Sequence, residues 1–241
     1  MPDAPIDLLA IGAHPDDVEL TCGGTLVKAA RRGYRTAVID LTGGEAGTHG
    51  SKAQRGEEAV RAAQVLGVAE RANAGLPDAG LHNTDETRRV VVELIRRFRP
   101  RVVILPFPIG RHPDHRVASE LSRDASYLAG LKNYPAGGEP HRPEKILYTL
   151  AYREDPVKPT FVVDITEEFA TKLEAIRCYA SQFDGIMAAG EIFPAGQDIY
   201  ENVRMHCARA GSLIRTAYGE PYLTHETVRI DDVVAVGVRS M

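Results

Sequence analysis

Short apolar runs alternate with longer amphipathic segments along this chain, and that order restricts the folds it can adopt. Residues 6–13, 36–41 and 101–105 are short, mostly apolar runs with the length of strands that are buried on both faces. Helical periodicity covers residues 18–32 and 51–66. Because strands that alternate with helices of this length form βαβ units, we predict an α/β fold. It is a Rossmann-like domain with a mostly parallel sheet covered by helices on both faces.

Local signals mark two helix starts. Ser51, followed by Gln54, resembles a capping box at the start of the helix 51–66, and Asn83 with Glu86 repeats this signature before residues 87–98. The remaining predicted elements are a helix after residue 115 through about 129, strands near 145–152 and 160–163, and helices near 167–181 and 198–217.

The whole chain, residues 1–241, is predicted to be one domain. No repeat, low-complexity tract or linker divides it, and the glycine- and proline-rich stretch 133–145 is interpreted as a surface connection. Hydrophobic residues make up 44% and charged residues 26% of the chain. This balance is typical of a globular protein with enough apolar surface for a core.

Charge and cysteine content exclude several classes of protein. A net charge of −4 argues against a general binder of nucleic acid or of anionic membranes, which would need a basic surface. Cys22, Cys178 and Cys207 are scattered and odd in number, so they fit neither a disulfide framework nor a cysteine metal site. The N-terminus lacks the basic region of a signal peptide, and no membrane span is present. We therefore expect a cytoplasmic protein.

Two segments that contain histidine and aspartate follow predicted strands. His14-Pro15-Asp16-Asp17 follows the first strand, and the segment 111–115 follows the strand that ends at residue 105. Parallel strands would bring both segments to the same edge of the sheet, where ligands bind in such folds. A catalytic zinc ion takes imidazole and carboxylate ligands and keeps one position open. His14 and Asp17, three residues apart, with His115 therefore predict a site for one zinc ion per chain.

The same residues have a simpler interpretation. A single His-Pro or Asp-Asp pair often marks a helix start, and Asp16 or Asp17 could cap the helix at Val18. On that interpretation the chain would be a non-catalytic sugar- or nucleotide-binding α/β module. Two such segments, both at predicted strand ends, favour the metal site.

These motifs resemble a known family. Residues 13–17 (AHPDD) with 112–115 (HPDH) resemble the paired signature of the LmbE-like, or PIG-L, zinc deacetylases. The resemblance covers about residues 6–185 and is closest to the branch of bacillithiol biosynthesis. Its further matches are Asp40-Leu41-Thr42, Gly44-Glu45, Gly47-Thr48, Arg55, Gly75-Leu76-Pro77-Asp78, Leu128-Ala129-Gly130-Leu131, His141-Arg142-Pro143 and Ser181-Gln182-Phe183.

The resemblance implies the same three metal ligands and assigns catalytic roles to their neighbours. Asp16 would be the general base, a role that suits a carboxylate adjacent to a ligand. His112, oriented by Asp114, would lie beside the metal as general acid or oxyanion stabiliser. Some relatives place a tyrosine at the position of Gly110, so in this chain Arg111 is the candidate for further help to the oxyanion.

The resemblance also implies a substrate, a small amino-sugar conjugate. We expect N-acetylglucosaminyl malate, deacetylated with release of acetate, with another N-acetylglucosamine conjugate (a disaccharide or an inositol conjugate) as the alternative. Arg55 would bind substrate, Arg111 directly precedes His112, and Glu45 at the end of the second strand would position substrate or shape its loop. A homo-oligomer, with a hexamer as one form, is implied as well.

Overall fold

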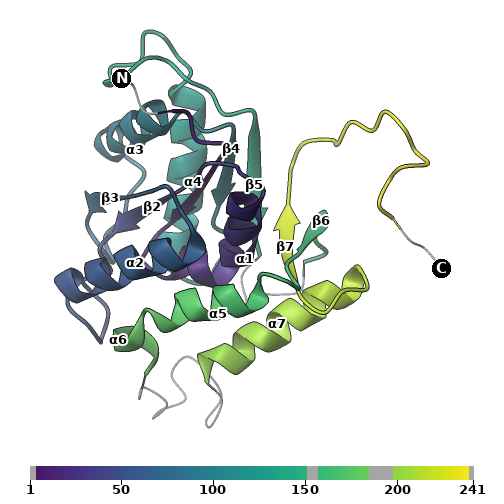
Figure 1. Cartoon of the computed structure of the whole chain (residues 1–241). Coiled ribbons are helices and arrows are strands. Elements are labelled where there is room, and N and C mark those ends of the chain that lie inside the picture. Colours follow the sequence, from purple (N-terminus) through teal and green to yellow (C-terminus); the bar gives the residue numbers. More distant parts are fainter. Residues whose placement is uncertain (1–3, 151–156, 185–197, 239–241) are drawn as a thin grey trace.

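A seven-stranded sheet forms the middle layer of a computed structural model that describes residues 4–150, 157–184 and 198–238 (Figure 1). Its strand order is β3-β2-β1-β4-β5-β7-β6. The strands from β3 to β5 are parallel, and β7 is antiparallel to both of its neighbours. The predicted fold class is confirmed. The strands are β1 (Leu8–Gly12), β2 (Thr36–Thr42), β3 (Glu70–Leu76), β4 (Val102–Leu105), β5 (Lys145–Thr149), β6 (Phe161–Asp164) and β7 (Gly219–Leu223).

Helices cover both faces of this sheet (Figure 1). On one face α3 packs against α4, and on the other α5 packs against α1 and α2. The central strands are buried on both sides: Leu9 and Ile11 belong to the core cluster beneath α3 and α4, whereas Ala10 between them packs with residues of α1. The helices are α1 (Asp17–Arg31), α2 (Lys52–Leu66), α3 (Asp85–Phe98), α4 (Pro113–Leu128), α5 (Phe169–Arg177), α6 (Ala180–Phe183) and α7 (Ile199–Leu213).

Two strands were missed by the hydrophobic pattern. β3 lies at the edge of the sheet, and its polar and alanine residues are mostly half-buried or exposed. β7 contains Pro221, which argues against a strand inside a sheet because it has no amide hydrogen to donate. In the described ladder, however, β5 pairs only with Tyr222 and Leu223. Pro221 therefore lies past that ladder and pairs with Val162 of β6 alone.

The helix starts show one confirmed signal and one wrong one. The Ser51 hydroxyl accepts a hydrogen bond from the amide of Gln54, as predicted. The cap of α3 is Thr84, which forms a capping box with Thr87, whereas Asn83 donates through its side chain to Asp124 on α4. The predicted helix 167–181 is divided into α5 and α6, and residues 151–152 of a predicted strand lie outside the described residues.

The strand order places a functional edge between β1 and β4. The chain runs from β1 outward to β2 and β3 and then returns to β4 on the other side of β1. At such a reversal the loops after two adjacent parallel strands diverge and leave room for a ligand. Both histidine segments follow these strands. Within the described ranges, no helix is long and apolar enough to cross a bilayer.

Candidate active site

Three histidines from two distant segments meet at this edge. His14 follows β1 directly, and His112 and His115 lie at the start of α4, with Pro113 as its first residue. The ring centroids are 4.9 Å apart for His14 and His112, 5.3 Å for His14 and His115, and 4.7 Å for His112 and His115. The fold thus brings the two predicted segments together.

His14, Asp17 and His115 form a compact set, which we call the metal triad. His115 Nε2 lies 3.1 Å from Asp17 Oδ1, and His14 Nδ1 lies 3.4 Å from Asp17 Oδ2. One ligand atom from each residue falls within 4.8 Å of the others. Two imidazole nitrogens and a carboxylate at this spacing fit a divalent ion that retains an open position.

A second group in the described residues, His14 with His112 and Asp114, meets the same distance criterion. Asp114 Oδ2 lies 3.5 Å from His14 Nε2, and Asp78 Oδ1 lies 3.0 Å from the same His14 nitrogen. Because two carboxylates already contact Nε2 of His14, its other ring nitrogen, Nδ1, is the one that remains available to bind a metal. The metal triad is therefore the better site.

Asp78 is a further residue of the candidate site, for which no local sequence pattern predicted a role. A carboxylate on one ring nitrogen of a ligand histidine fixes its tautomer and leaves the other nitrogen for the metal. Asp78 is itself fixed, because its carboxylate accepts hydrogen bonds from the amides of Ala46 and Ala79. Its signal was available: the matched segment Gly75-Leu76-Pro77-Asp78 follows the end of β3. That strand had not been recognised.

The electrostatics of the metal triad favour positive charge. Burial opposes protonation of His14, but its hydrogen bond to the Asp17 carboxylate and the surrounding carboxylates outweigh burial and raise the pKa of His14 to about 9. The pKa of His115 is also raised, because Asp17 outweighs the effect of burial. Burial would raise the pKa of Asp17, yet the two histidines hold it well below its usual range. A cation at this position would take the place of these protons.

Asp16 adopts a strained backbone conformation, and its side chain does not cap α1. Its φ of 110° lies in the left-handed region, which costs a residue other than glycine about 1–3 kcal/mol. Although Asp16 precedes α1, its side chain makes no capping hydrogen bond. The interpretation of Asp16 as a simple cap therefore fails. Burial raises its pKa to about 7, opposed by the charge of Arg55, so this carboxylate beside the metal triad is suited to accept a proton.

Arg55 of α2 holds Asp16 in place. Its Nη2 donates to Asp16 Oδ2 at 3.0 Å and to the carbonyl of Pro15 at 2.7 Å, and its Nη1 donates to the carbonyl of Gly44 at 2.9 Å. A Cβ at Gly44 would lie 2.0 Å from Nη1, and the φ of Gly44 is +69°, so this loop needs glycine. Arg55 positions Asp16 here, and its contact with substrate stays a prediction.

His112 is presented as a neutral hydrogen-bond donor. Its Nδ1 accepts a hydrogen bond from the amide of Asp114 at 3.2 Å, so the proton of the neutral ring is on Nε2. Burial, with the charges of His115 and His14, lowers the pKa of His112 and keeps the ring neutral. The Asp114 carboxylate instead accepts from the amide of Ala79 at 2.8 Å. Asp114 thus orients the His112 ring through the backbone amide of Asp114 and not through its carboxylate.

A pocket of about 240 Å³ opens beside these groups. Glu45 shapes its loop, because its carboxylate accepts hydrogen bonds from the amides of Gly43, at 3.0 Å, and Asp78, at 3.3 Å. Arg111 is exposed immediately before His112. The pocket is lined by His14, Asp16, Ala46, Gly47, Arg55, Asp78, Ala79 and His112.

Replacing Asp78 with asparagine should weaken metal binding. The amide lacks the negative charge that fixes the tautomer of His14, and the loss of such a partner typically reduces metal affinity about 10–100-fold. Competition with a chelating dye would measure the affinity. Asp124→Asn, on the surface of α4, is the matched control and should leave it unchanged. Equal affinities for both variants would remove Asp78 from the metal site.

Comparison with known proteins identifies a family of deacetylases. The family model described as PIG-L, GlcNAc-PI de-N-acetylase, matches residues 9–126. Diacetylchitobiose deacetylase of Thermococcus kodakarensis is 35% identical over 191 residues, which cover 73% of this chain and 70% of that protein. A probable N-acetyl-α-D-glucosaminyl L-malate deacetylase 2 of Bacillus anthracis is 28% identical, with 73% and 81% covered.

Solved structures are similar over almost the whole chain. The crystal structure of a conserved protein from Thermus thermophilus has a TM-score of 0.84 and 36% identity, and the match covers 94% of this chain and 98% of that one. Together with the similarity to the Thermococcus kodakarensis enzyme, this shows that the chain belongs to the PIG-L, or LmbE-like, family.

Proposed function

We propose that this chain is a metal-dependent hydrolase that removes the N-acetyl group from an N-acetylglucosamine conjugate and releases acetate. The observation that carries the proposal is the metal triad with Asp16 and His112 beside it at the edge of one pocket. The names of the relatives support the same reaction on amino sugars. A non-catalytic module has no comparable support, because Asp16 does not cap its helix.

The residues divide the reaction between them. One zinc ion per chain is our proposal for the metal, which when bound would activate water and polarise the acyl oxygen. Asp16 takes a proton from the attacking water while the water oxygen forms a bond to the amide carbon. The Nε2 hydrogen of His112 stabilises the oxyanion. The C–N bond then breaks, and the proton held by Asp16 passes to the leaving nitrogen.

N-acetylglucosaminyl malate is the substrate that we propose. Its two carboxylates need cationic partners, and the guanidinium of Arg111 can hold a carboxylate with two parallel hydrogen bonds. Arg111 is exposed next to His112, and Lys52 is exposed beside Glu45 on the other segment that lines the pocket. The guanidinium of Arg55 is bonded to Asp16 and to two backbone carbonyls.

A disaccharide is the second candidate. The relative from Thermococcus kodakarensis, whose name gives diacetylchitobiose as the substrate, has a higher identity than the malate deacetylase. A neutral sugar also avoids repulsion by the carboxylates of Asp16 and Asp78 in the pocket wall. The homo-oligomer implied by the family stays a prediction.

Acetate release from a panel of conjugates would decide between these substrates. We expect kcat/KM for N-acetylglucosaminyl malate to exceed that for N-acetylglucosamine and diacetylchitobiose by about 10–150-fold, the equivalent of one charge-assisted contact of about 1.5–3 kcal/mol. Arg111→Ala should reduce this preference, and Arg89→Ala, on the exposed surface of α3, should not. A higher value for diacetylchitobiose would reject malate and support the disaccharide. No acetate from any conjugate would reject the proposed reaction.

A further inference from the structure

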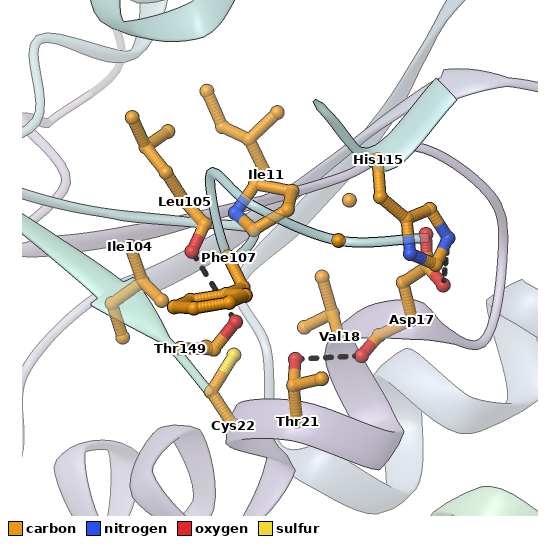
Figure 2. Close-up of a pocket in the computed structure, with 13 residues that line it drawn as sticks. Ile11, Asp17, Val18, Thr21, Cys22, Ile104, Leu105, Phe107, His115 and Thr149 are labelled. Carbon is orange, nitrogen blue, oxygen red and sulfur yellow. Dashed lines mark hydrogen bonds and ion pairs between the residues drawn. The ribbon is translucent and has the colours of Figure 1, made fainter. Parts of the chain in front are cut away.

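A second cavity adjoins the metal triad, and the triad residues Asp17 and His115 form one end of it (Figure 2). Its volume is about 50 Å³. The walls come from the first half of α1 and from the ends of β1, β4 and β5. Side chains that line the cavity include those of Ile11, Val18, Cys22, Ile104, Phe107 and Thr149.

This cavity is apolar although two threonines line it. The hydroxyl of Thr21 donates to the carbonyl of Asp17 at 2.7 Å, and that of Thr149 donates to the carbonyl of Leu105 at 3.3 Å (Figure 2). Both hydroxyl groups therefore donate their hydrogen to backbone carbonyls and not into the cavity. A buried water needs two to four polar partners, and the inner part of this wall offers few. The cavity is better suited to an alkyl group than to water.

We propose that this cavity, called the acyl chamber from here on, receives the alkyl part of the acyl group during hydrolysis. The inference rests on the proposed function. For the reaction, the carbonyl carbon must lie at the metal triad, and its two substituents then diverge. The sugar side faces Asp16 and His112 in the larger pocket, and the alkyl side faces Asp17 and His115 at the opening of the chamber.

Two residues close the chamber and would determine the length of the acyl group. Cys22, on α1, is 1% exposed, and Phe107, in the loop after β4, is 6% exposed. Neither belongs to the metal triad or to its hydrogen-bonded partners. A chamber of about 50 Å³ holds an acetyl group and only a few further carbons. One methylene too many in such a pocket typically reduces kcat/KM about 10–200-fold.

The test compares acyl lengths on one sugar. We would measure kcat/KM for the N-acetyl, N-butanoyl and N-hexanoyl derivatives of glucosamine with the metal-loaded enzyme. The unmodified protein should prefer acetyl to hexanoyl by more than about 10-fold. Phe107→Ala opens the chamber and should raise the ratio of hexanoyl to acetyl at least about 10-fold. Cys22→Met fills the chamber and should lower the ratio of butanoyl to acetyl, whereas Cys207→Met, at a buried cysteine of α7, should leave it unchanged.

A readout without catalysis keeps the inference independent of the reaction. Small apolar cavities bind xenon, so crystals under xenon pressure should show the gas between Cys22, Ile104 and Phe107. Cys22→Met should abolish this density, and Cys207→Met should retain it. These cysteine variants also serve if Phe107→Ala does not fold. If the enzyme releases acetate but none of the chamber variants changes the ratios of kcat/KM between acyl lengths, the acyl chamber alone is overturned. If the enzyme hydrolyses neither an acylated glucosamine nor any conjugate, the deacetylase proposal is overturned.

Discussion

Alanine in place of His115 should leave the protein without bound metal and without measurable acetate release. Removing a residue that only orients a ligand typically costs about 10–100-fold in metal affinity, and removing a ligand itself should cost more. His14→Ala should behave in the same way, because two remaining ligands rarely hold a divalent ion tightly. Metal content by elemental analysis, together with acetate release, measures both effects.

His112 is not expected to replace a lost ligand. Its Nδ1 is occupied by the amide of Asp114, and its ring belongs to the pocket rather than to the metal triad. His82→Ala, at an exposed position, is the matched control and should retain full metal content and activity. If the His14 and His115 variants both kept one ion per chain, the metal triad would be wrong. Iron or cobalt in place of zinc would leave the triad intact, since these ligands accept several metals.

Replacing Asp16 with asparagine is expected to separate catalysis from metal binding. The variant should keep its metal and lose about 10²–10⁴-fold in kcat, the usual contribution of a general base. Asparagine has nearly the same shape, tolerates a positive φ, and retains an oxygen that can accept from Arg55. It cannot take a proton from water. Asp17→Asn, one position along, should instead weaken metal binding, because that carboxylate lies against both ligand histidines.

Three measurements are needed to interpret the result for the Asp16 variant. Metal analysis and a melting curve establish that the fold and the site are intact, and steady-state kinetics then give kcat. Asp85→Asn, on the exposed first turn of α3, is the control for an acid-to-amide change and should have normal turnover. Near-normal kcat for the metal-loaded Asp16 variant would place the base elsewhere, and Glu45 would be the next candidate.

Local sequence patterns predicted the central architecture and proposed the residues of the candidate metal site. Short, mostly apolar runs predicted β1, β2 and β4, because a strand covered on both faces is apolar at most of its positions. The ligands were also evident, since His14 and Asp17 lie within one turn and the segment that contains His115 follows a second strand of the same sheet. These properties depend on local pattern and on the rule that parallel strands end at one edge.

Contacts between distant segments account for the rest of the candidate site. Asp78 meets His14 across 64 positions of the sequence, and Arg55 meets Asp16 across 39. No local pattern specifies such pairs, because they follow from how the edge strand β3 and helix α2 pack beside β1 and β2. The same holds for β7 with Pro221 and for the acyl chamber, whose walls come from elements that are far apart in the sequence. Hydrophobic periodicity reports which face of an element is buried, whereas packing decides which side chains meet there.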